Sequence, residues 1–377
     1  MSRQKSSARF RFSGAALLLS VLVFLVSALQ NGNTALYMLC ALVPCGMLLC
    51  STLFARIFSL DRMLLALSLW LCAAGVAALA LSDPEAALAQ CLRCGAGVAA
   101  LLVGGVLIRS LSSSLLTSVC SAFLGLLLLA GRILAPTLTL PLIEAAFALL
   151  LISFASLLTR QGPVTAILIA VAALVLLLFR QEISEAALWG VTVLLLLFAV
   201  DGRPVILLPA LAVTGILFFV AFSLFPAPSV PQESNVISAL VSAGAVGAET
   251  LPEGIASLNT VSLFPRLAGH YGLVFSGLTV LLFLPFTLRG TSVAAYARTR
   301  FHAAMAMGST LLLALRTLAG LLSLFGFLPF TGLSVPFLTS SLPDLCAEMF
   351  LVGLLCGISG RNEADLAEDA HLAMLAK

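Results

Sequence analysis

The sequence predicts an all-α protein that crosses a membrane about twelve times. Mean hydropathy is +1.17, hydrophobic residues make up 61% of the chain, and charged residues only 9%. A globular chain is roughly a quarter charged, so these charges are too few to cover a water-soluble surface. Runs such as 164–179 and 273–288 carry no formal charge and approach the about 20 residues of a spanning helix. They lack the alternation of a barrel strand, and in lipid only helices and closed barrels satisfy the backbone.

Charge and turn residues separate the apolar runs and set the expected boundaries. Two such breaks are Asp83-Pro84 and Gly162-Pro163. The expected spans are 14–30, 34–54, 62–82, 89–109, 114–130, 137–158, 163–180, 184–200, 204–225, 267–288, 302–326 and 344–359.

Basic residues suggest the orientation of these spans. Arg3, Lys5, Arg9 and Arg11 precede the first run, and no small-residue cleavage site follows it. With a cytoplasmic N-terminus, the loops on the inner side hold most of the arginines. The positive-inside rule then predicts that both termini, including a short tail over 360–377, are cytoplasmic.

The connection 226–266 is the longest between two expected spans, and we expect it on the outer side. It is rich in proline and glycine and carries Glu233, Glu249 and Glu253. Its apolar stretch Val236–Val246 is unusual for a solvated linker, which favours a functional loop over a disordered one.

Two ionisable residues fall inside expected spans, where a charge costs at least a few kcal/mol. Glu144 lies early in the sixth span and Arg316 near the middle of the eleventh. Each could line a cavity or be an internally paired or interfacial charge, and the two could pair with each other. Cys91 and Cys94 form a C-x-x-C without a second ligand pair, so we interpret them as packing residues and expect neither metal nor cofactor.

Proline and glycine cluster over Gly326–Phe337, which reads G-F-L-P-F-T-G-L-S-V-P-F. So many helix breakers predict an irregular segment, and such backbone is tolerated at membrane depth only where it faces protein or a cavity. Pro329, Thr331, Gly332 and Pro336 are therefore candidate site residues.

This segment resembles the motif G-L-L-P-V-T-G-x-P-L-P-F of the SEDS family, which contains FtsW, RodA and SpoVE. Pro141–Arg160 resembles the family's Q-P-S-E segment, with Glu144 at the glutamate, and Gln181–Leu188 resembles Q-P-D-L-G-T-A-L. Leu251-Pro252-Glu253 resembles an outer-loop L-P-E. The resemblance covers residues 62–359 and implies a ten-helix core, to which residues 1–61 add two N-terminal spans.

The resemblance implies a bacterial cytoplasmic membrane protein of cell division, elongation or sporulation. The family polymerises peptidoglycan glycan from lipid II, paired with a class B penicillin-binding protein in the divisome or elongasome. Its catalytic aspartate lies in H-T-D-F-I-F, where this chain has Val261, and no aspartate occurs between Asp201 and Asp344. Glu253 is the nearest upstream carboxylate that could replace it as general base.

Three functions follow from the residues and the resemblance. The first is a divergent glycosyltransferase, with Glu253 or another group as base. The second is a non-catalytic scaffold for a penicillin-binding protein, and the third a flippase for a lipid-linked precursor. No nucleic-acid partner is expected. The expected substrate or cavity residues are Glu144, Arg316, Gln181, Pro329, Thr331, Gly332 and Pro336.

Overall fold

The structure is a computed structural model. It describes residues 14, 17–25, 28–29, 34–111, 113–134, 143–224, 244–245, 247, 262–325, 327 and 333–375. Most of the connection 226–266, including Glu253 and Val261, lies outside the described residues, as do Pro329, Thr331 and Gly332.

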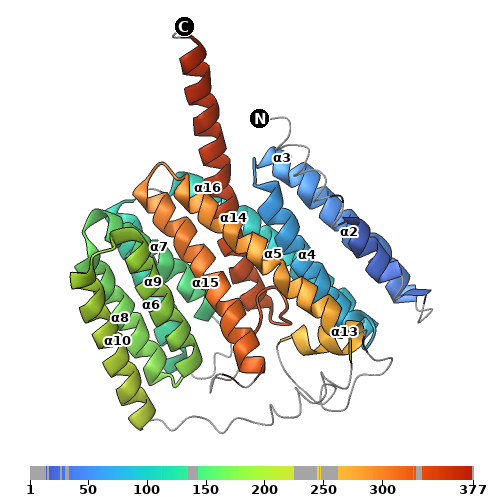
Figure 1. The fold of residues 1–377 in the computed structure, drawn as a ribbon, viewed down its shortest axis with the longest axis horizontal. Coiled ribbons are helices and arrows are strands. Elements are labelled where there is room, and N and C mark those ends of the chain that lie inside the picture. The colour runs from blue at the N-terminus through green and yellow to red at the C-terminus, as the bar shows by residue number, and fades with distance from the viewer. Residues whose placement is uncertain are drawn as a thin grey trace.

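The described part is a bundle of helices (Figure 1), which confirms the all-α prediction. The elements are α2 (Thr34–Leu49), η1 (Cys50–Phe54), α3 (Ala55–Ile57), α4 (Arg62–Ala80), α5 (Pro84–Ser110), α6 (Leu115–Leu134), α7 (Ile143–Arg160), α8 (Pro163–Phe179), α9 (Ile183–Asp201), α10 (Pro204–Leu224), α13 (Phe264–Leu281), α14 (Phe283–Ala295), α15 (Arg300–Leu324) and α16 (Leu342–Leu375).

Eight helical segments in the described residues are long and apolar enough to cross a membrane, and three shorter apolar helices accompany them. The expected boundaries agree with these helices to within a few residues at most ends. The span expected at 14–30 is only partly described, and the count of twelve stays a prediction. The division into a two-helix N-terminal part and a ten-helix core also stays a prediction.

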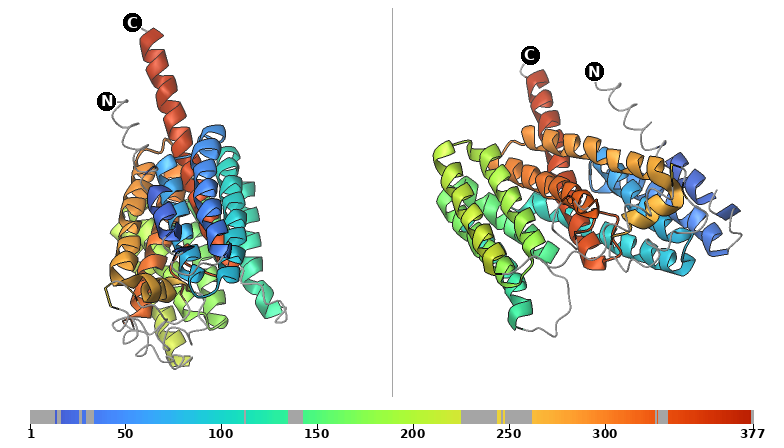
Figure 2. Two further views of the ribbon diagram at one scale, coloured as in Figure 1. Left: turned by 90° about the vertical axis from the view of Figure 1, so that its right-hand side faces the viewer. Right: turned by 60° about the horizontal axis from the view of Figure 1, so that its bottom comes forward.

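Helices α5 and α16 form the most extensive helix contact of the bundle, and glycines make it close. A Cβ on Gly353 of α16 would lie 2.1 Å from the carbonyl oxygen of Leu101 on α5, and one on Gly104 would lie 2.5 Å from that of Phe350. Small residues let helix backbones approach closely, the usual solution in membranes. The last turns of α16 extend beyond the bundle (Figure 2).

Asp61 joins three helices at the end of the bundle where α4 begins. Its carboxylate caps α4 by accepting from the Met63 N–H at 2.9 Å, and its Oδ2 accepts from Arg289 Nη2 at 2.5 Å and Ser359 Oγ at 2.8 Å. Burial alone would raise the pKa of Asp61, but Arg289 and these hydrogen bonds outweigh it and hold the pKa below its ordinary value.

Irregular backbone gathers at the opposite end. Gly272, with φ 80°, breaks α13, and the Leu273 N–H donates to the carbonyl of Gly244 at 3.2 Å. Residues 333–341 between α15 and α16 are not helical, which agrees with the irregular segment predicted there. The Leu263 N–H donates to the Leu338 carbonyl at 2.8 Å, which ties the start of α13 to this segment.

Candidate functional site

Three helices begin at this end with an acidic residue in the first turn. These residues are Glu144 on α7, Glu185 on α9 and Asp344 on α16. The N-terminus of a helix carries about half a positive charge, which stabilises carboxylates placed there. The fold therefore brings three carboxyl groups together where three helix dipoles favour negative charge.

Arg316 of α15 joins these carboxyl groups. It lies eight residues before the last residue of α15, Leu324, or about 12 Å along the axis. Its Nη2 donates to Glu144 Oε1 at 2.7 Å and lies 3.4 Å from Glu185 Oε1. Arg316 is only 4% exposed, so the pairing takes place in a medium that screens charge poorly.

A fourth carboxyl group completes the cluster. Glu348 lies one helical turn after Asp344, and its Oε1 is 3.8 Å from Arg316 Nε. Its Oε2 accepts the backbone N–H of Phe337 at 2.7 Å, which links the cluster to the irregular segment. Asp344 in turn is within hydrogen-bonding reach of Glu144.

The cluster has more acceptors than donors. Four carboxyl groups surround a single guanidinium, and all five side chains are buried. Within the described residues, one oxygen of each carboxyl group has no hydrogen-bond partner, and neither has Arg316 Nε. Buried polar atoms usually have partners, so the four carboxyl oxygens are suited to a ligand that supplies O–H donors, and Arg316 Nε is suited to an acceptor.

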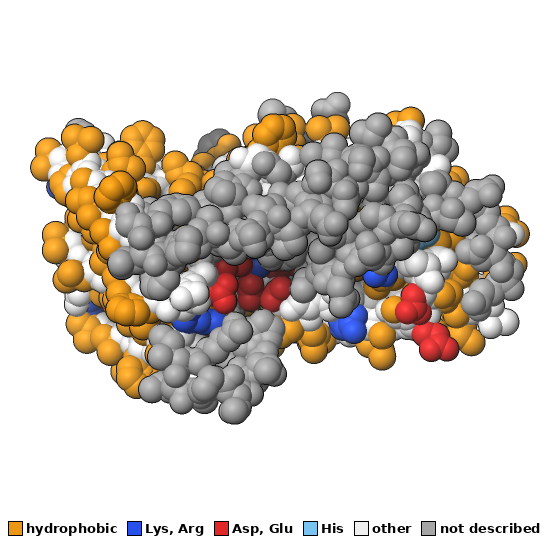
Figure 3. Space-filling model, turned by 90° about the horizontal axis from the view of Figure 1, so that it is seen from below, with side chains coloured by type: hydrophobic (Ala, Val, Ile, Leu, Met, Phe, Trp, Pro, Cys, Tyr) orange, Lys and Arg blue, Asp and Glu red, His pale blue; other side chains and the backbone are white. Residues whose placement is uncertain are grey.

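The cluster lies at the lower end of the bundle as drawn in Figure 1. Seen from below, acidic side chains gather in a hollow near the middle of this face, with basic side chains beside them (Figure 3). Ser262 pairs with Thr339 as an isolated bridge. This bridge holds Ser262, the residue after the position where the resemblance expects a catalytic aspartate, beside Thr339, three residues before the start of α16.

The structure brings together some predicted residues and separates others. Glu144 and Arg316 are in direct contact, and Pro336 is buried in the irregular segment beside Phe337. Gln181 instead lies exposed in the turn between α8 and α9, with φ 60°. No described contact joins its side chain to the cluster.

Three members of the cluster were not among the predicted site residues. Glu185 follows the turn after α8, a position typical of an interfacial charge, and Asp344 and Glu348 lie at the start of an apolar run. Their spacing of four residues, which places both on one face of an otherwise apolar helix, could have identified the last two.

Comparison with known proteins gives a consistent picture. Residues 249–364 match the family model of the FtsW/RodA/SpoVE cell cycle proteins. Probable peptidoglycan glycosyltransferases FtsW from two strains of Geobacter sulfurreducens are 27% identical over 211 residues, which is 50% of this chain. The chain spans 56% of the length of these curated relatives.

Solved structures show the same fold. One, reported for the structural coordination of polymerization and crosslinking by a peptidoglycan synthase complex, superposes with a TM-score of 0.63 at 21% identity. It covers 80% of this chain and 97% of that one. The rod shape determining protein RodA of Thermus thermophilus superposes with a TM-score of 0.60 at 18% identity, covering 80% and 96% of the two chains.

Proposed function

The chain is a member of the SEDS family, and from this premise we propose that it acts on a lipid-linked glycan of peptidoglycan synthesis. The proposed place is the outer face of the bacterial cytoplasmic membrane, with both termini cytoplasmic. The proposed substrate is lipid II or another undecaprenyl-linked sugar. The proposed partner is a class B penicillin-binding protein of the divisome or elongasome.

The observation that carries the proposal is the surplus of buried acceptors around Arg316. Unsatisfied carboxyl oxygens on Glu144, Glu185, Asp344 and Glu348 would accept the hydroxyl protons of a sugar. An anionic group placed directly among four carboxyl groups would meet repulsion instead. The cluster thus suits the glycan part of a lipid-linked substrate, with the carrier phosphates held elsewhere.

For the reaction we propose Asp344 as general base in place of the aspartate that Val261 cannot provide. Its carboxylate would take the proton of the attacking sugar hydroxyl, whose oxygen forms the new glycosidic bond. The bond from the anomeric carbon to the carrier diphosphate breaks, and the diphosphate leaves with the electron pair. Support comes from the Ser262–Thr339 bridge, which holds the residue after the family's catalytic position beside Thr339, three residues before the start of α16. Glu253 is the alternative base.

The test is glycan polymerisation by the purified protein on labelled lipid II, with its cognate penicillin-binding protein and the transpeptidase blocked. We expect polymer from the wild type, loss of polymer with Asp344→Asn, and retention with Glu253→Gln. Asparagine keeps the shape of the side chain but replaces one acceptor oxygen with an NH2 donor and cannot take the proton. The reverse pattern would assign the base to Glu253.

The missing aspartate also favours a second candidate, a non-catalytic scaffold. In that case no polymer would form beside an active family control, while the penicillin-binding protein would still co-purify. The comparisons do not favour the scaffold or the flippase over the polymerase. A flippase would move labelled lipid II across vesicles, dependent on Arg316, without forming polymer.

A further inference from the structure

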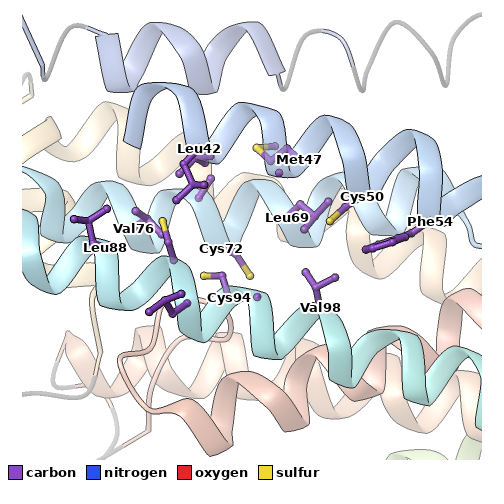
Figure 4. A pocket seen from close by; sticks show the side chains of 16 residues that line it. Leu42, Met47, Cys50, Phe54, Leu69, Cys72, Val76, Leu88, Cys94 and Val98 are labelled. Carbon is purple, nitrogen blue, oxygen red and sulfur yellow. The ribbon is translucent and has the colours of Figure 1, made fainter. Parts of the chain in front are cut away.

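An apolar cavity of about 570 Å³ lies between α2, α4 and α5, away from the charged cluster (Figure 4). Leu42 and Met47 of α2 face Leu69 and Cys72 of α4 and Val98 of α5 across it. Among the described residues that line it, none is charged and none carries a hydroxyl or amide side chain. The cavity therefore offers dispersion contacts and almost no hydrogen bonds.

The position of the cavity excludes water as its filling. Its wall on α4, Leu69 to Val76, lies in the middle of a membrane-spanning helix. Water in a cavity needs two to four polar partners, which this lining does not supply. An empty space of this size would cost its lining the contacts on one side. An apolar molecule or chain segment is the occupant that the chemistry allows.

The volume of the cavity and its opening narrow the choice of occupant further. A transmembrane helix about 10 Å wide and about 30 Å long takes roughly 2,400 Å³, several times the volume of this cavity. Leu42 and Leu92 at its rim are 53% and 79% exposed, so the cavity opens on the apolar surface that faces the bilayer. A single hydrocarbon chain can enter through this opening.

We propose that the cavity binds one acyl chain of a membrane phospholipid between α2 and the helices α4 and α5. No arginine or lysine lines it to hold a diphosphate, which argues against the carrier of a lipid-linked glycan as its occupant. Burial of an acyl chain here removes no apolar surface from water. Its selectivity therefore comes from shape and packing. The inference is independent of the proposed glycan chemistry.

Two glycines allow the cavity to be filled without distorting the helices. Gly46 on α2 and Gly95 on α5 both line it, and a Cβ added at either meets nothing within 4 Å. Leucine at these positions would occupy the space proposed for the acyl chain and is a better helix former than glycine. Gly277 on the exposed face of α13 has equally open surroundings and does not line the cavity, so Gly277→Leu is a matched control.

The test is photo-crosslinking of the full chain in vesicles of phosphatidylethanolamine and phosphatidylglycerol that carry a diazirine within the acyl chain. We expect adducts on peptides from α2, α4 and α5, loss of most of this yield in Gly46→Leu and Gly95→Leu, and no change in Gly277→Leu. Equal thermal midpoints of the variants would show that folding is intact.

Two results would overturn the proposal. The first is an adduct yield on these peptides that stays unchanged when the cavity is filled. The second is displacement of the adducts by unlabelled polyprenyl phosphate but not by an equal amount of unlabelled phospholipid, which would assign the cavity to a polyprenyl chain.

Discussion

Replacing Arg316 by methionine should destabilise the protein more than any other single change in the cluster. Methionine approximates the length of the arginine stem but leaves Glu144, Glu185 and Glu348, at 2.7, 3.4 and 3.8 Å from the guanidinium, without their cation. Removing one partner of a buried ion pair costs about 3–5 kcal/mol because the other charge stays buried and unpaired. At about 2 °C per kcal/mol, the apparent midpoint should fall by roughly 6–10 °C.

Tryptophan fluorescence during heating in detergent can measure this change close to the site. Trp189 of α9 stacks on Phe147 of α7 with ring centroids 5.3 Å apart, and these two helices carry Glu185 and Glu144. Arg316→Lys is the matched control, since it keeps the charge but loses the planar fork, and it should cost clearly less.

A second variant distinguishes unpaired charge from lost packing. Arg316→Met combined with Glu144→Gln, Glu185→Gln, Glu348→Gln and Asp344→Asn should regain most of the lost stability, because no buried charge of the cluster is left without a partner. A midpoint for Arg316→Met within about 1 °C of the wild type would refute the reasoning. It would mean that the carboxyl groups are neutral in the folded protein and need no cation.

Two further predictions concern contacts that hold the helices together. Gly353→Ala should lower the thermal midpoint, because its Cβ would overlap the Leu101 carbonyl at 2.1 Å and overpacking typically costs about 1–3 kcal/mol. The control Gly95→Ala should leave the midpoint unchanged or raise it. Equal midpoints of the two variants would contradict the close contact of α5 and α16. Asp61→Asn should cost about 1.5–3 kcal/mol through its weakened bonds to Arg289. Since the pKa of Asp61 is depressed, this stabilisation is complete above the ordinary aspartate pKa of about 3.9 and is lost as the pH falls through the folded value. Thermal midpoints of wild type and Asp61→Asn, recorded between neutral and acidic pH, should therefore converge only at the acidic end. A difference that vanishes near neutral pH would disprove that Asp61 is ionised and paired with Arg289.

The fold was largely predictable from the sequence because the bilayer leaves few alternatives. Apolar runs bounded by Asp83-Pro84 and Gly162-Pro163 became helices α5 and α8, each with proline in its first turn. The expected span 267–288 is divided between α13 and α14 at Leu282, and Gly272 is a non-helical residue within α13. Hydropathy does not register the division at Leu282, because the residues on both sides of it are apolar.

The site was less predictable because its members come from four helices. Glu144 and Arg316 stood out as charges within apolar runs, but their contact depends on how α7 and α15 pack, over a separation of 172 residues. Glu185 follows a turn, a position typical of an interfacial charge, and its contact with Arg316 depends on the position of α15. The roles of Glu253 and Gln181 in binding or catalysis stay predictions.

The close fit of α16 against α5 determines which parts of the site can move. Because Gly353 and Gly104 bring the two backbones into contact, a sliding of α16 would first require separation of the pair, and packed interfaces of this kind change between discrete arrangements rather than continuously. Asp344 and Glu348 are carried on this rigid pair, whereas Arg316 lies on α15. A change in the distance between Arg316 and these two carboxyl groups therefore requires movement of α15 against the α5–α16 pair.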